Sequence, residues 1–446
     1  MIRHGGSRLH PAQVIVIAYG LALLLGTCAL MLPVAAEGPG RASSVEALFT
    51  AGSAVFITGL AVVDTPTYWS PFGHGVILVL LQVGGLGVMS FASMLGIAVM
   101  RRIGLRSKLS AANEAKSDEI GDVRSLVAGI VKTSVVIELV VALLVFVRLA
   151  LTYESSPARA AWLAVFHSVS AFNNGGFALH SDSLVRYVSD PWICLPLSGA
   201  VILGGLGYPV LRQLRREFGR PLHWTMNTRL VLSASGVLLL AGTVFATVSE
   251  WTNPSTFGPL SSPERILAGF VHSTMSRSAG FNTVDTSQMD PVTWLGTDIL
   301  MFIGGGPAGT AGGIKVTTFA VLFFIIYTEV RGERAVNVLG KRLPRSTHRQ
   351  AISIALLGVA MVVSSTVALM AATSFGLDRI LFEVISAFGT VGLSTGITAD
   401  LPQAAQVYLV FLMFIGRLGP ITLATAFVLR RRTRMYELPK ERPIIG

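Results

Sequence analysis

Long apolar segments separated by short basic segments dominate the sequence. Residues 14–34, 126–147, 231–248 and 351–371 each approach the roughly 20 residues that a helix needs to cross a bilayer. None of these segments shows the alternating pattern of a β-barrel strand. The first lacks a clear signal-peptide cleavage pattern and further apolar segments follow it, so we interpret it as a retained helix. The pattern predicts an all-α polytopic membrane protein.

Composition supports this class of protein, and the positions of the basic residues predict which segments lie on which side of the membrane. Of the residues, 52% are hydrophobic and only 13% are charged, whereas a soluble domain has about a quarter charged residues. The net charge of +11 does not indicate nucleic-acid binding, because most of the 35 Lys and Arg lie in residues 3–8, 101–132, 212–229, 331–349 and 430–442. By the positive-inside rule, these basic segments and both termini are expected on the cytoplasmic side of the cell (inner) membrane.

A short motif, glycine followed by Leu or Phe, recurs four times at intervals of roughly 110 residues. It is written ITGL at 57–60, NGGF at 174–177, SAGF at 278–281 and TVGL at 390–393. Each copy follows a moderately apolar segment of about 12–15 residues, which is too short to cross a bilayer and is typical of re-entrant helices. We name residues 57–59, 174–176, 278–280 and 390–392 the four glycine turns.

A second glycine cluster follows each turn, as VGGLG at 83–87, LGGLG at 203–207, IGGGP at 303–307 and IGRLGP at 415–420. Each unit is predicted to contain a spanning helix (M1), a short half-helix, a glycine turn and a second spanning helix (M2). Because every unit starts and ends at a basic segment, the copies should be parallel, unlike inverted-repeat transporters. The sequence predicts four parallel pseudo-repeats with eight spanning helices around a central pore: residues 1–108, 109–219, 220–340 and 341–430, with a basic tail at 431–446.

The glycine turns suit a cation selectivity filter. Glycine adopts positive φ without steric cost, and rings of backbone carbonyls can replace the hydration shell of a cation. The predicted filter residues are Ile57, Thr58, Gly59, Asn174, Gly175, Gly176, Ser278, Ala279, Gly280, Thr390, Val391 and Gly392. The other interpretation is that these glycines only allow helices to pack closely, and for the second glycine clusters the two interpretations are about equal.

Acidic residues follow the turns and are candidates for an outer mouth that concentrates cations. They are Asp64, Asp182, Asp285 and Asp400. Ordinary solvated loop acids explain them equally well at this stage. The apolar segment around Glu138 holds a further acid, for which an interhelical hydrogen bond or ion pair is expected.

These motifs together make the chain resemble the Trk/Ktr/HKT superfamily of potassium transporters. The residues that carry the resemblance are ITGLAVVDT, FNNGGF, SRSAGFNTVD, TVGLSTG and GGGPAGTAGGIK, and it extends over essentially the whole chain. No additional spanning helix is expected before the first unit, which favours the shorter KtrB-type membrane subunit over TrkH. The resemblance implies four M1–pore helix–M2 units around one pore, a potassium ion at the filter carbonyls, and potassium selectivity through a glycine at position 59.

The resemblance also implies a gate. Residues 304–313 would form an intramembrane loop that breaks the third M2 helix beneath the filter, and Arg417 would be a pore-facing arginine. We name residues 304–313 the glycine loop. The expected gate residues are Gly304, Gly305, Gly306, Pro307, Ala308, Gly309, Thr310, Ala311, Gly312, Gly313, Lys315 and Arg417. Snorkelling of Lys315 toward an interface is the simpler alternative.

Partners and competing functions follow from the same resemblance. It implies a homodimer and a separate cytosolic ring of Rossmann-like (RCK/KTN) subunits that bind nucleotide, while sodium activation of flux stays open. No nucleotide-binding G-x-G-x-x-G motif follows a strand pattern in this chain. A sodium-selective or non-selective transporter is the first alternative. A polytopic membrane enzyme is less favoured, because His residues are scattered and Cys28 and Cys194 lie in apolar segments without ligand spacing.

Overall fold

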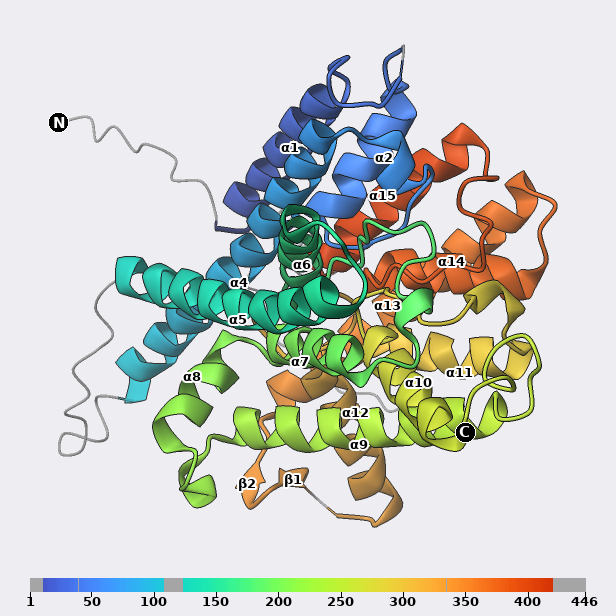
Figure 1. Cartoon of the computed structure of the whole chain (residues 1–446). Coiled ribbons are helices and arrows are strands. Elements are labelled where there is room, and N and C mark those ends of the chain that lie inside the picture. Colours follow the sequence, from blue (N-terminus) through green and yellow to red (C-terminus); the bar gives the residue numbers. More distant parts are fainter. Residues whose placement is uncertain (1–10, 39, 108–122, 334, 420–446) are drawn as a thin grey trace, which may run out of the picture.

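The protein is almost entirely helical in the computed structural model, which describes residues 11–38, 40–107, 123–333 and 335–419 (Figure 1). In each of the first two units a long helix is followed by a shorter one. In the first unit the helices are α1 (Pro11–Leu30), α2 (Ser44–Val55), α3 (Thr65–Tyr68) and α4 (Pro71–Ser107). In the second they are α5 (Val123–Thr152), α6 (Pro157–Phe172), α7 (Pro191–Leu206) and α8 (Tyr208–Glu217).

The other two units follow the same plan. The third unit contains α9 (Met226–Ser249), α10 (Ser262–Met275), α11 (Pro291–Phe302) and α12 (Val316–Val330). The fourth contains α13 (Arg345–Ala372), α14 (Leu377–Gly389) and α15 (Gln403–Leu418). A two-stranded antiparallel pair, β1 (Asn337–Val338) and β2 (Lys341–Arg342), joins α12 to α13 and was not expected in an all-α chain.

The half-helices α2, α6, α10 and α14 have 12, 16, 14 and 13 residues, so none of them can cross a bilayer. Local sequence fixes where they begin. Ser43 and Glu46 form a capping box at the start of α2, and Ser261 and Glu264 repeat it at the start of α10. All four half-helices end at a glycine turn, where their carbonyl ends carry partial negative charge.

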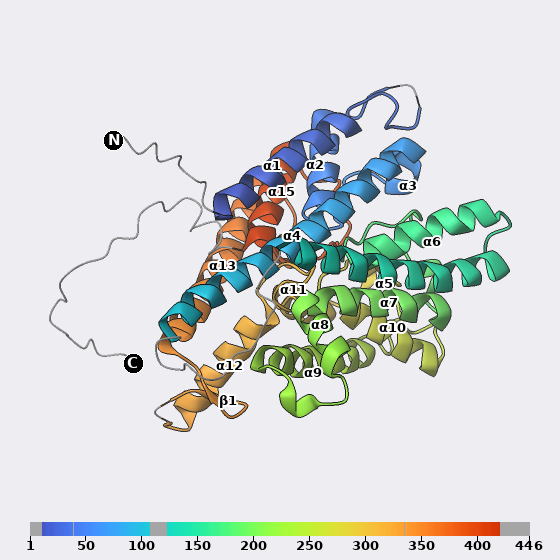
Figure 2. The same cartoon turned by 90° about the vertical axis from the view of Figure 1, so that its left-hand side faces the viewer.

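The half-helices and their neighbours close a ring. Helix α4 packs on α5 and α6, α7 packs on α10, α11 packs on α14, and α15 packs on α2. Figures 1 and 2 show the same closure, with the red α15 beside the blue α2. The first and last units are therefore neighbours, which is the arrangement that surrounds an axis.

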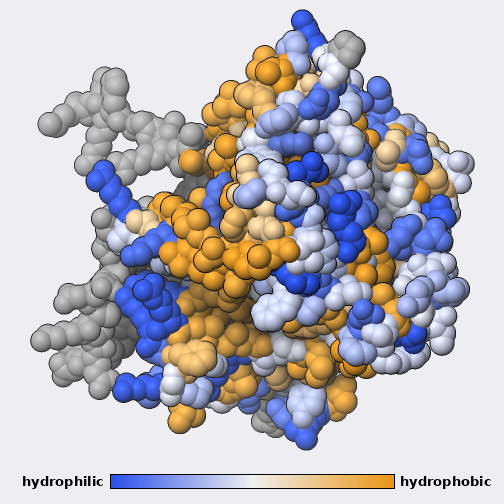
Figure 3. Space-filling view, in the orientation of Figure 1, coloured by the Kyte–Doolittle hydropathy of each residue, from blue (hydrophilic) through white to orange (hydrophobic). Residues whose placement is uncertain are grey.

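The outer surface is apolar. Exposed Leu139, Leu143 and Val237 lie on α5 and α9, and Figure 3 shows a hydrophobic area over these two helices. Among the described residues, five helices are long and apolar enough to span a membrane, or up to six if α7 and α8 form one bent span. Helices α12 and α15 are apolar but shorter. A multi-pass membrane fold is therefore clear, whereas the count of eight spans stays a prediction.

Two M2 helices are broken, although we expected only the third to be. Helix α11 ends at Phe302 and α12 begins at Val316, directly after Lys315, as the glycine content predicts. Helix α7 also ends at Leu206, and α8 leaves it at 102°. Pro209 causes this second break because it has no N–H to donate to Gly205 O, and Gly207 adopts φ +91° between the two helices.

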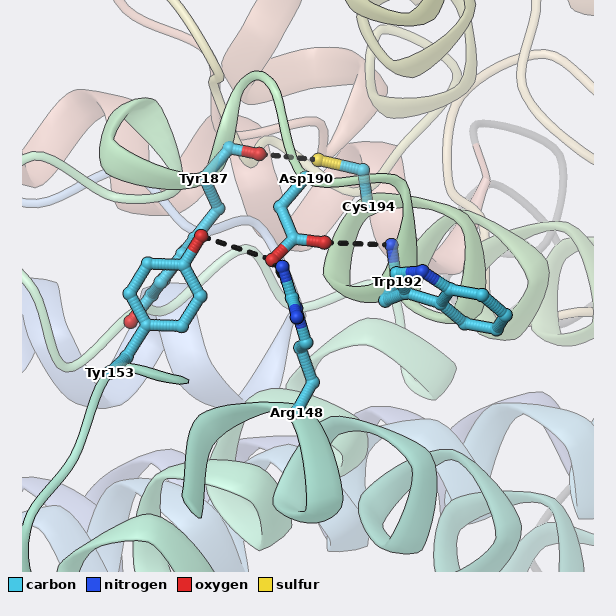
Figure 4. Close-up of polar contacts among 6 residues, drawn as sticks. All are labelled: Arg148, Tyr153, Tyr187, Asp190, Trp192 and Cys194. Carbon is cyan, nitrogen blue, oxygen red and sulfur yellow. Dashed lines mark hydrogen bonds and ion pairs between the residues drawn. The ribbon is translucent and has the colours of Figure 1, made fainter. Parts of the chain in front are cut away.

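The C-terminal end of α5 and the N-terminal end of α7 are joined by a polar network centred on Asp190 (Figure 4). Its carboxylate accepts hydrogen bonds from Arg148 Nε at 2.6 Å and Tyr153 Oη at 3.0 Å, and it caps α7 through Trp192 N at 2.9 Å. Cys194 is buried there, with Sγ 3.2 Å from Tyr187 O. The predicted unit boundaries at 108/109 and 430/431, the tail 431–446, and the basic residues Arg3 and Arg8 lie outside the described residues.

Candidate ion-conducting site

The four glycine turns share an unusual backbone conformation. In each turn the first residue and the glycine both have positive φ, while the residue between them does not. The first residues are Ile57 (56°), Asn174 (60°), Ser278 (111°) and Thr390 (48°). Non-glycine residues adopt positive φ rarely, so four occurrences in register show that the turns are equivalent. This alternation is local evidence for a fourfold repeat.

The amide groups of the turns point back to their own half-helix. Thr58 N donates to Ser53 O at 2.7 Å, Gly175 N to Ser170 O at 2.6 Å, and Val391 N to Ser386 O at 2.9 Å. Within the described part of the chain, eleven of the twelve carbonyl oxygens of the turns accept no hydrogen bond; Thr390 O is the exception. Unpaired carbonyls are costly in a buried site unless water or a cation contacts them.

The turns meet around one point. Each glycine lies so close to the next turn that an added Cβ atom would be 2.1 to 2.7 Å from a backbone oxygen: Gly59 faces Gly175, Gly176 faces Ala279, Gly280 faces Val391, and Gly392 faces Thr58. The last contact returns to the first unit and closes the ring. The ring tolerates no side chain at these positions, which explains why all four are glycine.

Two serine side chains accept hydrogen bonds from the amides of turn glycines. Ser53 Oγ accepts a hydrogen bond from Gly59 N at 3.0 Å, and Ser386 Oγ accepts one from Gly392 N at 3.1 Å. Ser170 occupies the same place relative to Gly176, but its buried hydroxyl has no partner within the described residues. Serine six residues before a turn glycine was therefore a signal in the sequence that we did not use.

Two buried glutamates accept hydrogen bonds from residues next to the second and fourth turns. Glu138 on α5 accepts hydrogen bonds from Gln82 on α4 at 3.1 Å and from Asn173, just before the second turn, at 3.2 Å. The expected interhelical hydrogen bond at Glu138 is thereby confirmed. Glu383 on α14, which sequence reasoning missed, accepts from Thr395 N at 3.1 Å and Thr398 Oγ1 at 2.9 Å, beyond the fourth turn.

The glycine loop inserts into the break between α7 and α8. Gly306 N donates to Gly205 O at 2.8 Å and Thr310 N donates to Gly204 O at 3.1 Å. The loop thus satisfies carbonyls that the break leaves without helical partners. Pro307 O lies 2.4 Å from the Cβ position of Gly207. The loop and the second break are parts of one contact, so the second and third units depart together from the plan of the other two.

Three cations reach the loop from three directions. Arg417, on α15 and 5% exposed, donates Nη1 to Thr310 O and Nη2 to Gly84 O at 3.5 Å. Lys315 Nζ donates to Ala311 O at 2.5 Å, so it is directed into the loop rather than snorkelling. Arg277, in the residue before the third turn, donates Nη2 to Gly304 O at 3.3 Å and Nη1 to Ser235 O at 3.1 Å. Sequence reasoning missed Arg277.

The four acids after the turns have separate environments. Asp64 accepts from Thr67 Oγ1 and Ser181 Oγ, both at 2.7 Å, and Asp285 caps a short turn through Ser287 N at 2.9 Å. Asp182 pairs with Arg186 Nη2 at 2.8 Å. Burial alone would raise the pKa of Asp182, but the hydrogen bond and the charge of Arg186 outweigh burial and lower this pKa below its usual value. Asp400 is exposed. Asp182 is the weakest candidate for an outer mouth because Arg186 already neutralises it.

The fold and this site together define a class: a multi-pass membrane protein with four half-helices that end in a closed ring of backbone carbonyls. Comparison with known proteins identifies the family. The chain matches the TrkH family, described as cation transport proteins, over residues 9–437. The chain belongs to this family, and it is therefore a transporter and not an enzyme.

Individual relatives agree with this assignment over nearly the full length. The chain is 36% identical to the Ktr system potassium uptake protein B of Bacillus subtilis, covering 94% of this chain and 93% of that protein. It is 35% identical to the protein of the same name from Vibrio alginolyticus (97% and 94%) and 31% identical to the potassium/sodium uptake protein NtpJ of Enterococcus hirae (98% and 98%).

A solved structure shows the same fold. The potassium transporter TrkH from Vibrio parahaemolyticus superposes with a TM-score of 0.75 at 17% identity, covering 96% of this chain and 87% of that one. At this identity the likeness concerns the fold alone. The predicted family and the all-helical membrane architecture are confirmed.

Proposed function

We propose that this protein takes up potassium across the cell membrane through a pore within a single chain, with the four glycine turns as its selectivity filter. The observation that carries the proposal is the closed ring from Gly59 to Gly392, whose carbonyls accept no hydrogen bond from the described residues except at Thr390. Such carbonyls can replace the hydration shell of a potassium ion, which is the cargo of the site and not a resident cofactor. The names of two relatives, which are potassium uptake proteins, support the same cargo.

The glycine loop, with Lys315 and Arg417, is proposed as the gate. Two cations donate to successive loop carbonyls, Thr310 O and Ala311 O, and so hold a positive charge beside the loop. A positive group in a pore raises the cost of cation passage. Release of these two bonds would allow the loop to leave the α7–α8 break and reduce the barrier.

Selectivity is proposed to favour potassium over sodium, since all four ring positions are glycine. The name of the Enterococcus hirae relative includes sodium, so a sodium-selective or non-selective transporter is the alternative to be tested. Asp64, Asp285 and Asp400 are proposed to attract cations at the outer mouth. Activation by sodium is a further proposal for the flux assay.

Regulation is proposed to come from a cytosolic ring of Rossmann-like (RCK/KTN) subunits that bind nucleotide. The supporting feature is the concentration of exposed arginines on the side expected to be cytoplasmic, including Arg215, Arg220 and Arg345. The names of two relatives place them in a Ktr system. A homodimer with both termini cytoplasmic belongs to the same proposal.

The test is growth of potassium-uptake-deficient cells on limiting potassium, with and without this chain, followed by rubidium and sodium uptake. Rescue with rubidium uptake that exceeds sodium uptake supports the proposal, whereas rescue of sodium uptake alone favours the alternative. Deleting residues 305–312 should raise flux and weaken regulation. Unchanged or lower flux from a correctly inserted deletion protein would count against the gate.

A further inference from the structure

The glycine loop contacts the side chains at the first position of three glycine turns. The side-chain NH₂ of Asn174 faces hydrogen-bond acceptors when the amide is oriented with its nitrogen toward the loop. In this orientation it donates to Thr310 Oγ1 at 3.2 Å. Ser278 Oγ accepts a hydrogen bond from Gly312 N at 3.2 Å. Thr390 Oγ1 lies 2.1 Å from the Cβ position of Gly312. The loop therefore lies directly against the turns of units two, three and four.

The Ser278 hydroxyl is fully buried and uses both of its hydrogen-bonding roles in this contact. It accepts from Gly312 N in the loop and donates to Thr390 O at 3.2 Å in the next turn. A hydroxyl has one proton to donate, so the orientation that bonds Thr390 O is the one that leaves a lone pair for Gly312 N. The two bonds consequently support each other.

Thr390 O is the exception in the ring. Of the twelve turn carbonyls in the described chain, it alone accepts a hydrogen bond, and the donor is Ser278. A carbonyl that already accepts a hydrogen bond is a weaker ligand for a cation than a free one. The first residues of the turns lie nearest the glycine loop, so an ion at their level occupies the innermost position of the proposed filter. With the loop in its present position, the fourth unit therefore offers that ion a weakened ligand.

The close approach at Gly312 makes this contact sensitive to loop position. A Cβ atom there would also lie 2.9 Å from Gly389 O, so any side chain would push the loop away from the turn. Since Gly312 N is a buried donor, it needs an acceptor when the loop is seated. Ser278 Oγ provides that acceptor, and loop movement must break the bond.

We propose that the Ser278 hydroxyl couples the gate to the filter: it anchors the seated loop through Gly312 N and, in the same orientation, occupies Thr390 O. When the loop leaves, Ser278 Oγ loses the bond from Gly312 N that fixes the side-chain orientation, so the hydroxyl is free to rotate away from Thr390 O and release that carbonyl to the ion. Loop position thereby sets both the barrier and the quality of the innermost ion site. This inference rests on the proposed filter and gate.

The experiment measures rubidium flux and the rubidium/sodium permeability ratio of the full chain in liposomes. Four proteins form a double-mutant cycle: wild type, S278A, the 305–312 deletion, and both changes together. S278A should raise flux about fivefold, the effect of losing one net hydrogen bond from the seated loop. The deletion should change the permeability ratio in the wild-type background and change it less than twofold in S278A.

Controls separate coupling from general damage to the pore. S170A removes the buried hydroxyl of Ser170 on the second half-helix, for which the described residues provide no partner, and should leave flux and ratio unchanged. S278T keeps the hydroxyl, so the deletion should still change the permeability ratio in this variant, as it does in the wild-type background. If S278A does not insert, S278C replaces it, because a thiol is a weak donor.

Two results would overturn the inference. One is additivity, in which the deletion changes the permeability ratio equally with and without the Ser278 hydroxyl. The other is wild-type flux and ratio in S278A or S278C. In either case, a loss of selectivity in G392S would leave the proposed filter standing, whereas an unaffected G392S would remove the filter proposal itself.

Discussion

Gly392 N lies 3.1 Å from Ser386 Oγ, so the fourth glycine of the ring is held by a side chain of its own half-helix. The first unit repeats this relationship through Ser53 and Gly59 at 3.0 Å. A hydrogen bond that orients the glycine amide also orients the carbonyl on the other side of the same peptide plane. The two serines should therefore influence ion selectivity without touching the ion.

We predict that Ser53→Ala and Ser386→Ala each lower the rubidium/sodium permeability ratio about fivefold, since a net hydrogen bond contributes about 1 kcal/mol. Ser170→Ala is the matched control, because its hydroxyl has no partner within the described residues. Ion competition in liposome flux measures the ratio. An equal effect of all three substitutions would show that the hydroxyls act only through packing.

Arg277 links the third turn to the start of the glycine loop. Its guanidinium donates to Gly304 O and Ser235 O, and replacing it with Met leaves both carbonyls without that donor. We expect Arg277→Met to lower the thermal midpoint and to raise unregulated rubidium flux, with partial rescue in Arg277→Lys. The exposed Arg379→Met is the control. A lower midpoint with unchanged flux would limit Arg277 to a structural role.

Asp190 is expected to contribute to stability and not to selectivity. It is 4% exposed, caps α7 and accepts from Arg148 and Tyr153. Asp190→Ala removes a cap and two side-chain hydrogen bonds, which should cost about 2 kcal/mol. Thermal unfolding in detergent should show a midpoint lower by a few degrees, with an unchanged permeability ratio. Asp182→Ala, which breaks an exposed ion pair, should cost less than about 1 kcal/mol.

The environment of His180 predicts acid sensitivity of the segment between α6 and α7. Burial, followed by the nearby charges of His167 and Arg186, lowers the pKa of His180 to about 4, while Asp182 opposes the shift. The ring stacks on His167 with centroids 5.7 Å apart, and Nε2 lies 3.0 Å from Tyr187 Oη. Because the folded pKa lies below the unfolded value of about 6.5, its contribution to stability is complete above pH 6.5 and is lost as the pH falls toward 4.

The measurement for His180 is the thermal midpoint from pH 7.5 to 4. His180→Gln should make the decline shallower, whereas substitution of the exposed His223 should not. A slope identical to wild type in His180→Gln would show that other groups cause the acid sensitivity.

The sequence predicted the four turns because glycine is required there for a steric reason that is local and repeated. The half-helices could be predicted equally well from the sequence, because the apolar segments that form them are too short to cross a membrane. The start of α12 directly after Lys315 was also predictable from the end of the glycine-rich stretch.

The break at Gly207 was not predicted, because GGLG at 84–87 lies inside the continuous helix α4 while GGLG at 204–207 ends α7. The difference depends on Pro209 and on the glycine loop, which lies about a hundred residues later in the chain and donates hydrogen bonds to the carbonyls of Gly204 and Gly205. Arg277 was hidden for a similar reason: its partners, Ser235 and Gly304, are distant in sequence and both contribute backbone oxygens.

The most direct test of the central claim is the permeability ratio of Gly392→Ser. A Cβ atom at this position would lie 2.1 Å from Thr58 O, and the residue has φ +98°, so the substitution must distort the ring where it closes. Gly199→Ser is the matched control, because a Cβ there meets nothing within 4 Å. The account predicts that Gly392→Ser inserts normally and loses at least about tenfold of its preference for rubidium over sodium, with no change in Gly199→Ser. Wild-type selectivity in Gly392→Ser would contradict the assignment of the glycine turns as the filter.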